Sequence, residues 1–292
     1  MSRSFSVCVL ALVALAAVSR PSGQIFDADA PVRVSHYHLN VTSVDEHKKF
    51  WVDTLGGTAA KFGDLDVIRF GDVLLILRVQ TPTGGTRGTS FDHIGLAAPD
   101  VPALTKKVVA NGYALTVGRE TPGAKPPATG DSAVYGRFSY LVGPDGVKVE
   151  LVTATDAANA PPIAHHHVHF VNPQYVEMRD WYVKALDATV RTGPNTFTDF
   201  FAGADLPGIG YMLNFFRWEL DEKLTGTAGR AVDHVGFEVR NLEQFTKQLS
   251  GKGITLTQPH RRSAEMNNVG TAMMVDPWGT VIELTEGLEK AL

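Results

Sequence analysis

Residues 92–116, DHIGLAAPDVPALTKKVVANGYALT, return later in the chain as residues 233–257, DHVGFEVRNLEQFTKQLSGKGITLT. Aligned without gaps, eight of the 25 positions are identical, and most of the others keep their apolar or polar character. Each copy predicts a strand, then a helix, then a glycine (Gly112 or Gly253) that ends the helix in the left-handed conformation. A repeat of this length indicates that one structural unit occurs at least twice.

The repeat extends on both sides of these segments. Upstream, HYHLNVTSVDEHKKFWVDTLGG (36–57) matches HVHFVNPQYVEMRDWYVKALDA (167–188), each a predicted strand that opens with His-x-His and leads into a helix. Downstream, YLVGPDGVKVELV (140–152) matches MMVDPWGTVIELT (273–285), each a predicted hairpin whose last strand carries Glu-Leu after an apolar residue. The adjacent aromatic residues of the two helices are expected in the core: Phe50, Trp51, Trp181 and Tyr182.

These matches divide the chain into four segments. We predict a signal peptide over 1–24, a first module over 32–155, a linker over 156–163 and a second module over 164–288. The linker is small, polar and Pro-containing, which is typical of a connection between domains. Each module contains two strand–helix–strands units, so the chain is expected to hold four βαβββ units.

The N-terminal segment has the layout of a secretory signal peptide. Arg3 precedes an apolar run over 7–18, and small residues follow it. At 12 residues the run is too short to span a bilayer core of about 30 Å, although a retained anchor is the alternative. We therefore expect a periplasmic or secreted protein that has no membrane association after cleavage. The single cysteine, Cys8, lies inside this run, so any metal site must use His and carboxylate ligands.

The composition indicates a globular protein with no nucleic-acid partner. Of the 292 residues, 44% are apolar and 20% are charged, which is enough apolar material for a core. The formal net charge is −4 and no long basic run is present, which argues against nucleic-acid binding. The expected partner is a small-molecule substrate.

The strands present a recurring set of two histidines and one glutamate. Because alternate strand residues share a face, His36, His38 and Asn40 lie together, opposite the apolar Tyr37, Leu39 and Val41. The same alternation places His167 and His169 on one face, and it gives the later strands one His each (His93, His234) and one Glu each (Glu150, Glu283). Two imidazoles and a carboxylate suit a divalent ion such as Fe(II), Mn(II), Zn(II) or Ni(II).

At this point the residues resemble a known family. The repeated pattern H-x-H-L-N-V, D-H-I-G and P-D-G-x-x-x-E-L is similar to that of the vicinal oxygen chelate superfamily. That superfamily contains glyoxalase I, bleomycin-resistance proteins and type I extradiol ring-cleaving dioxygenases. The resemblance implies an α+β fold of two tandem modules, each built of paired βαβββ units that form a curved mixed sheet around a metal pocket.

The resemblance also implies roles for individual residues. The ligands would be His36, His93 and Glu150 in the first module and His167, His234 and Glu283 in the second. His36 and His167 are preferred over His38 and His169 because each stands 14 residues before the first helix aromatic, which is the family distance. His38, His169 and His260, the last expected in a loop after the second-module helix, are then candidate catalytic groups. Asn40 is a candidate substrate-binding residue.

Two departures from the family patterns leave the reaction open. Glyoxalase I adds a carboxylate ligand from the strands that here read VLLILRV (73–79) and YMLNFF (211–216), and neither contains an acid. Extradiol enzymes place a His before the second ligand and a Tyr before the final Glu, whereas in the second module no His separates His169 from His234, and Met273 and Met274 precede Glu283. The loop 118–131 either closes over the site or is a disordered insertion.

The sequence thus predicts a divalent-metal-dependent enzyme of this fold, a lyase or dioxygenase of the glyoxalase or extradiol type, that acts on a small oxygenated substrate. The alternative is a non-catalytic, resistance-type protein of the same fold that binds a small molecule.

Overall fold

The computed structural model describes residues 30–133, 135–153, 163–207, 212–264 and 267–291. The predicted signal peptide and nearly all of the predicted linker lie outside these ranges. Within them, no helix has the length and apolar character needed to cross a membrane. The division into modules at 32–155 and 164–288 stays a prediction.

In its described residues, the first half of the chain forms nine strands and two α-helices. Helix α1 (Val44–Lys48) continues as the π-helical stretch η1 (Lys49–Thr54), and α2 (Val101–Ala110) follows later. A short 3-10 turn, η2 (Pro144–Gly146), joins the last two strands. The strands are β1 (Val32–Val41), β2 (Thr58–Phe62), β3 (Leu65–Phe70), β4 (Val73–Val79), β5 (Phe91–Ala98), β6 (Ala114–Leu115), β7 (Thr129–Ser132), β8 (Gly136–Val142) and β9 (Lys148–Thr153).

The second half repeats this order. Its helices are α3 (Tyr175–Leu186) and α4 (Leu242–Gly251), and the 3-10 turn η4 (Leu288–Ala291) ends the described chain. Its strands are β10 (Ala164–Val171), β11 (Thr189–Val190), β12 (Phe201–Asp205), β13 (Met212–Phe216), β14 (Val232–Val239), β15 (Leu256–Ser263), β16 (Val269–Val275) and β17 (Val281–Glu286).

The strands form two mixed sheets, and each sheet combines the two halves of the chain. One sheet has the order β15-β16-β17-β14-β1-β4-β3-β2, and the other has the order β11-β12-β13-β10-β5-β9-β8-β6 with β7 paired to β8. We call them the β1–β14 sheet and the β5–β10 sheet, after the antiparallel strand pairs that join the halves. The predicted α+β class with two mixed sheets is confirmed, but the two units of one half do not share a sheet.

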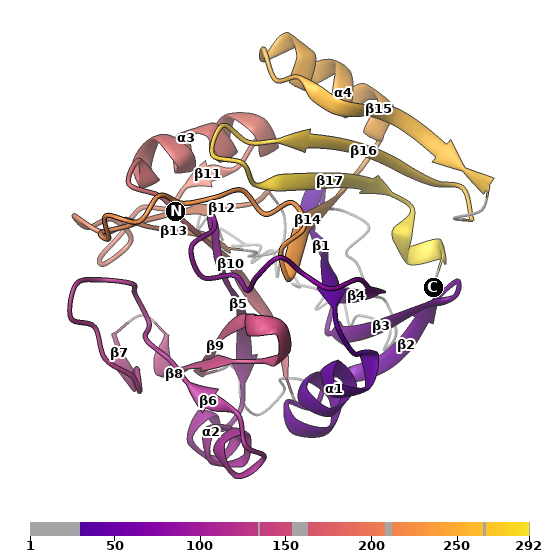
Figure 1. Ribbon diagram of the computed structural model, residues 1–292. Coiled ribbons are helices and arrows are strands. Elements are labelled where there is room, and N and C mark those ends of the chain that lie inside the picture. The colour runs from indigo at the N-terminus through magenta and orange to yellow at the C-terminus, as the bar shows by residue number, and fades with distance from the viewer. Residues whose placement is uncertain (1–29, 134, 154–162, 208–211, 265–266, 292) are drawn as a thin grey trace, which may run out of the picture.

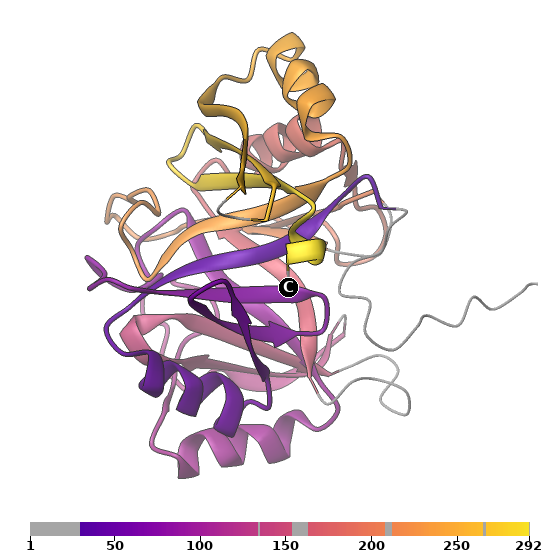
Figure 2. The same cartoon turned by 90° about the vertical axis from the view of Figure 1, so that its right-hand side faces the viewer.

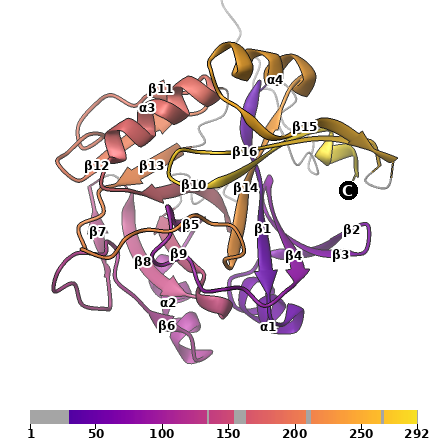
Figure 3. The same ribbon diagram turned by 45° about the horizontal axis from the view of Figure 1, so that its top comes forward.

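The helices lie outside the sheets, as Figures 1 and 2 show, with α1 and α2 at one end of the molecule and α3 and α4 at the other. Figure 3 shows α3 and α4 together above the central strands β10, β14 and β1. At that end, the Lys252 ammonium lies 2.7 Å from the Asp187 carboxylate, which joins the C-terminal ends of the two helices. The helices therefore cover the outer faces of the sheets, and the histidines project from the inner faces.

The apolar faces of the strands form the core. Tyr37, Leu39 and Val41 are fully buried on the face of β1 opposite His36, as the alternation predicts. The expected aromatic core is also confirmed, because Phe50, Trp51 and Tyr182 are fully buried and Trp181 packs against them partly exposed.

A hydrogen-bonded chain attaches α1 and η1 to the turn before β9. The Trp51 indole N–H donates to His47 Nδ1 over 3.0 Å, and His47 Nε2 donates to the Asp145 carboxylate over 3.0 Å. Burial lowers the pKa of His47, although the hydrogen bond to Asp145 opposes that shift. His47 is therefore held neutral, with Nδ1 as the acceptor.

Candidate metal centres and the adjoining cavity

The six predicted ligands meet in two clusters, each drawn from both halves of the chain. In one, His93 of β5 and Glu150 of β9 join His167 and His169 of β10, so that this cluster has a fourth possible ligand. In the other, His36 of β1 joins His234 of β14 and Glu283 of β17. Within each cluster the ligand atoms lie within 4.8 Å of one another. The expected triads inside each module were wrong, because the sheets pair units across the halves.

Two glycines allow the histidine of one half to reach the ligands of the other. Gly95 lies directly across the strand pair from His167, and Gly236 lies across from His36. A Cβ at Gly95 would overlap the His167 ring, and a Cβ at Gly236 would overlap the His36 ring. The D-H-x-G repeat therefore supplies one ligand and the space for a second.

In the β5–β10 site, three ligand atoms form a near-equilateral triangle. The Glu150 Oε2 atom is 3.0 Å from Nε2 of His93 and 3.0 Å from Nε2 of His167, and the two Nε2 atoms are 3.2 Å apart. His93 and His167 are fully buried, and the Glu150 side chain is 5% exposed.

The spacing of these atoms fits a divalent ion. Metal bonds to His nitrogen and carboxylate oxygen are about 2.0–2.2 Å long, so two ligands at right angles stand about 3.0 Å apart. The Asp92 carboxylate accepts from Nδ1 of His93 at 2.5 Å, which leaves Nε2 to face the centre. Such a carboxylate behind a ligand histidine orients its ring and strengthens the ligand.

Electrostatics keep the Glu150 carboxylate ionised. Burial alone would raise its pKa, but hydrogen bonds from His167 and His93 outweigh that effect and hold the pKa well below its ordinary value. For His93, burial lowers the pKa, whereas hydrogen bonds to Asp92 and Glu150 raise it above the usual value. Burial lowers the pKa of His167. An anionic carboxylate beside a neutral imidazole favours the binding of a cation, because both groups can donate electron pairs to it.

The β1–β14 site has two histidines and one glutamate in a more exposed setting, and among the described residues its cluster has no counterpart of His169. Oε2 of Glu283 is 2.9 Å from Nε2 of His36 and 3.2 Å from Nε2 of His234, and the Glu283 side chain is 18% exposed. Asp233 accepts from Nδ1 of His234 at 2.8 Å, as Asp92 does for His93. Burial lowers the pKa of His234, but hydrogen bonds to Asp233 and Glu283 raise it to about 9.

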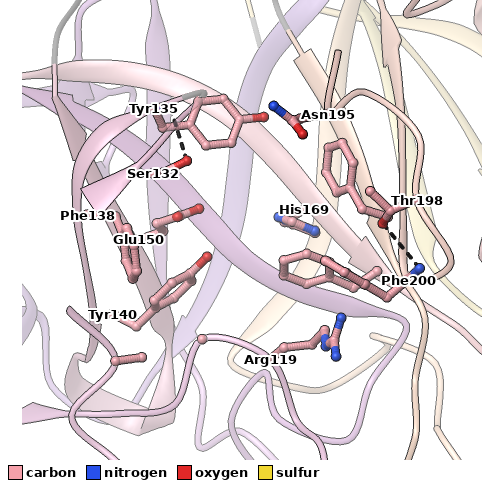
Figure 4. Close-up of a pocket in the computed structure, with 14 residues that line it drawn as sticks. Arg119, Ser132, Tyr135, Phe138, Tyr140, Glu150, His169, Asn195, Thr198 and Phe200 are labelled. Atoms are coloured by element: carbon pink, nitrogen blue, oxygen red, sulfur yellow. Dashed lines mark hydrogen bonds between the residues drawn. The ribbon is translucent and has the colours of Figure 1, made fainter. Parts of the chain in front are cut away.

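A cavity of about 430 Å³ adjoins the β5–β10 site (Figure 4). Glu150 and His169 point into it, between Tyr135 and Tyr140 on one side and Phe200 on the other. Its walls come from both halves and are largely aromatic, with a few polar groups: Tyr135, Phe138, Tyr140, Phe200, Phe201, Phe216, Arg119, Ser132, Asn195 and Thr198. The 118–131 loop is ordered, and Gly118, Arg119 and Ala128 form part of the wall.

The predicted catalytic residues occupy three different environments. His169 is buried beside the cavity, with its ring centroid 4.4 Å from that of His93 and 3.9 Å from that of Phe216, and neither ring nitrogen has a hydrogen-bond partner among the described residues. His38 stacks on His234 with 4.6 Å between ring centroids, and burial lowers its pKa to about 3. His260 belongs to strand β15 instead of a loop, and it is in neither ligand cluster.

The predicted substrate-binding residue Asn40 supports a ligand instead of lining the cavity. Its side-chain amide donates to Asp233 over 3.3 Å and to the Arg230 carbonyl over 3.0 Å. Asn40 thus stands behind the Asp233–His234 pair of the β1–β14 site, and the cavity described above lies on the other sheet.

Several residues of the site escaped the sequence reasoning. Asp92 and Asp233 each stand directly before the histidine of the repeated D-H motif, and this recurrence is a usable sequence signal. Tyr140 lies opposite Glu150 in the β8–β9 register, but its counterpart in the other half is Met273, so the repeat concealed it. Tyr135 stacks on His167 at 5.8 Å between centroids and accepts from the Asn214 amide, and no sequence pattern marked it.

Comparison with known proteins identifies the fold. Residues 33–151 match the family model of the Glyoxalase/Bleomycin resistance protein/Dioxygenase superfamily. The crystal structure of glyoxalase I from Zea mays has a TM-score of 0.65 and 17% identity, covering 89% of this chain and 94% of that one. A putative dioxygenase from Bacillus subtilis subsp. subtilis str. 168 has a TM-score of 0.63 and 14% identity, covering 87% of this chain and 84% of that one.

At these identities the likeness to solved structures concerns the fold alone, and no curated protein matches the chain. The family model covers β1 to β9, which include the D-H-I-G strand and the P-D-G turn. Residues 33–151 therefore match the Glyoxalase/Bleomycin resistance protein/Dioxygenase superfamily model, and the chain as a whole shares the fold of glyoxalase I from Zea mays.

Proposed function

We propose that the β5–β10 site is the active centre of a divalent-metal-dependent enzyme that acts on a small oxygenated molecule with an apolar or aromatic body. The observation that carries this proposal is the continuity between the ligand triangle and the cavity, because Glu150 belongs to both. The cavity has the size of a small-molecule site and mostly aromatic walls, as such sites usually have.

The donor set favours Fe(II) or Mn(II) among the candidate metals. Two histidines and one carboxylate on one side of an ion, with the remaining positions open, form the arrangement of non-haem iron oxygenases. When bound, such an ion supplies a Lewis acid that holds and polarises two neighbouring oxygens of the substrate. The residues of the chain then determine which substrate enters and where its protons go.

Dioxygenase-like chemistry is favoured over glyoxalase-like chemistry. Because the triad crosses the halves, its final glutamate is Glu150, and a tyrosine, Tyr140, does precede it. A glyoxalase site would need a further carboxylate on β13, where the residues paired with His167 and His169 are Met212 and Asn214. The missing tyrosine found in the second module therefore does not apply to this mixed site, whereas the histidine before the second ligand is absent here too, because no histidine lies between His47 and His93.

Two side chains are placed to move or hold a substrate proton. His169 faces the cavity with both ring nitrogens unpartnered, and burial holds its pKa well below the ordinary value, so it is neutral and able to accept a proton. Burial beside Glu150 raises the pKa of Tyr140 well above its usual value, so its hydroxyl stays protonated and donates hydrogen bonds.

The alternative is a protein of the resistance type, which binds a small molecule without chemistry. The aromatic cavity alone fits either function, but a binder has no need of an anionic carboxylate, Glu150, and an imidazole, His169, in the cavity wall. On the basis of residues 1–24, we also propose a periplasmic or secreted location.

The test is a turnover screen with the protein loaded with Fe(II) or Mn(II). Catechols should be consumed with uptake of oxygen, and H169Q should lower kcat by a factor of about 100 or more while metal content stays the same. H260Q changes a residue that belongs to neither ligand cluster, and it is the control. Conversion of 2-oxoaldehyde thiol adducts instead would favour the lyase. Tight ligand binding without turnover would favour the binder.

A further inference from the structure

In each site, an aspartate accepts a hydrogen bond from the histidine that follows it in the D-H motif. The two sites differ in the group that contacts this aspartate from its other side. In the β5–β10 site this is Lys148, an ammonium group on β9 that is 3% exposed. Its Nζ lies 2.9 Å and 3.2 Å from the two carboxylate oxygens of Asp92. Asp92 in turn accepts from His93. The ammonium, the carboxylate and the ligand ring thus form one continuous chain of hydrogen bonds.

The same ammonium also holds the wall of the cavity. Lys148 Nζ donates to the Gly118 carbonyl oxygen over 2.7 Å, and Gly118 and Arg119 line the cavity. It also lies 5.5 Å from the centroid of Tyr140, another wall residue. A buried cation is costly unless it is paired and hydrogen-bonded, so these contacts are held tightly. One side chain therefore contacts both the support of the metal ligand and the substrate-facing loop.

The β1–β14 site is arranged differently at the equivalent position. The register places Val281 beside His234 on β17, and the repeat aligns Val281 with Lys148. Asp233 accepts instead from the Gly229 backbone N–H at 2.7 Å and from the Asn40 amide at 3.3 Å. The second aspartate is thus supported by neutral groups.

We propose that Lys148 is a positioning residue that couples the metal centre of the β5–β10 site to the cavity wall at Gly118, and that the β1–β14 site lacks this coupling. Removing the ammonium disturbs both ends of the chain of contacts, because Asp92 loses its cation and Gly118 loses its donor. The inference rests on the proposed function in one respect, namely that the β5–β10 site binds a metal ion.

The test uses Co(II) as the metal probe in the full-length protein. The E283Q background disables the β1–β14 site, so that titration and the visible Co(II) spectrum report on the β5–β10 site alone. In this background, K148M should weaken Co(II) binding by about 10–100-fold, as loss of a group behind a metal ligand usually does, and should shift the Co(II) absorption bands. Amide hydrogen exchange over residues 116–122 should become faster, and Co(II) should no longer slow it.

Matched controls use the second site as a reference. In the E150Q background, K148M should leave Co(II) binding at the β1–β14 site unchanged, and so should V281M, the corresponding apolar change there. If K148M fails to fold, K148Q, which keeps a donor for Gly118 but no charge, carries the same expectation for affinity and spectrum.

The outcomes separate the two proposals. Wild-type affinity and spectrum in the Lys148 variants would overturn the coupling and leave the proposed function standing. A loosened loop with unchanged Co(II) affinity and bands would also overturn it, because Lys148 would then be a loop anchor only. If E283Q itself binds no Co(II), the proposed function fails and the coupling falls with it.

Discussion

Gly95 and His167 face each other across the β5–β10 strand pair, and the imidazole fills the space that a side chain at Gly95 would occupy. The ring is fully buried and sits among other ligands, so it cannot move aside without leaving the triangle. A residue with no side chain at position 95 is therefore a requirement of this arrangement of His167, His93 and Glu150.

The first prediction follows from this contact. G95A should destabilise the fold by about 1–3 kcal/mol, the usual cost of overpacking, and should remove metal from the β5–β10 site only. G236A should do the same at the β1–β14 site, because its Cβ would overlap His36. Chemical denaturation and elemental analysis provide the two readouts. G251A is the control, since a Cβ there meets nothing within 4 Å.

The second prediction concerns which ligands act together. With two centres filled, H93A and H167A should each reduce bound metal from two ions per chain to one, and the double variant should lose no more. H36A combined with H167A should lose both ions, because these histidines belong to different clusters. Loss of both ions in H93A combined with H167A, at retained fold, would contradict the crossed arrangement and restore triads within the halves.

The third prediction uses the volume of the cavity. Ala128 lines the cavity without contributing a metal ligand or a proton-transfer group. A128F should fill part of the 430 Å³ and raise KM about tenfold or more for the substrate identified by the screen, with metal content unchanged. A128S, which changes the volume little, should behave like the wild type. Equal KM values for both variants would show that substrate binds elsewhere.

The fourth prediction concerns pH and lies away from the metal centres. Because burial lowers the pKa of His47 in the folded protein, the unfolded chain binds its proton more readily. The free energy of unfolding should therefore fall as pH drops below about 6.5, by up to about 1.4 kcal/mol per pH unit from this group. Protonation of Nδ1 also removes the acceptor of the Trp51 indole.

Urea unfolding of the chelator-treated protein between pH 8 and pH 4.5 measures this effect. H47Q should show a shallower decline than the wild type, even if it is less stable at pH 8. Asp145 contributes in a lower window, because its pKa is depressed and its stabilising effect is lost only as pH falls through that lowered value. Parallel curves for the wild type and H47Q would rule out the proposed role of His47.

The sequence was sufficient for the fold class and for choosing residues that the structure gathers into two clusters, but not for their grouping. Alternation along β1 and β10 placed the histidines opposite the core, and the D-H-x-G repeat marked the second ligands. Both signals are local to a strand. Whether His36 meets Glu150 or Glu283 depends on which units pair in a sheet, and two units with the same pattern of apolar residues can pair either way.

The residues that line the cavity were harder to predict from the sequence than the residues of the two clusters. Tyr135 and Phe200 reach it from loops of different halves, and their positions follow from tertiary packing and not from any local period. His169 was proposed as catalytic because it follows His167 by two residues, and its position beside the cavity agrees with that choice. The same argument also selected His38, which instead stacks on His234.

Because each sheet combines strands from both halves of the chain, the two ligand clusters can form in a definite order during folding. His93 and His167 are separated by 74 residues, whereas His36 must wait for Glu283, 247 residues further along the chain. Closing the longer loop costs more entropy and requires almost the whole polypeptide. A growing or emerging chain can therefore complete the centre beside the cavity while its C-terminal strands are still missing. The β1–β14 site forms only when those last strands are in place, so a metal ion bound there would report that β14 and β17 have joined β1.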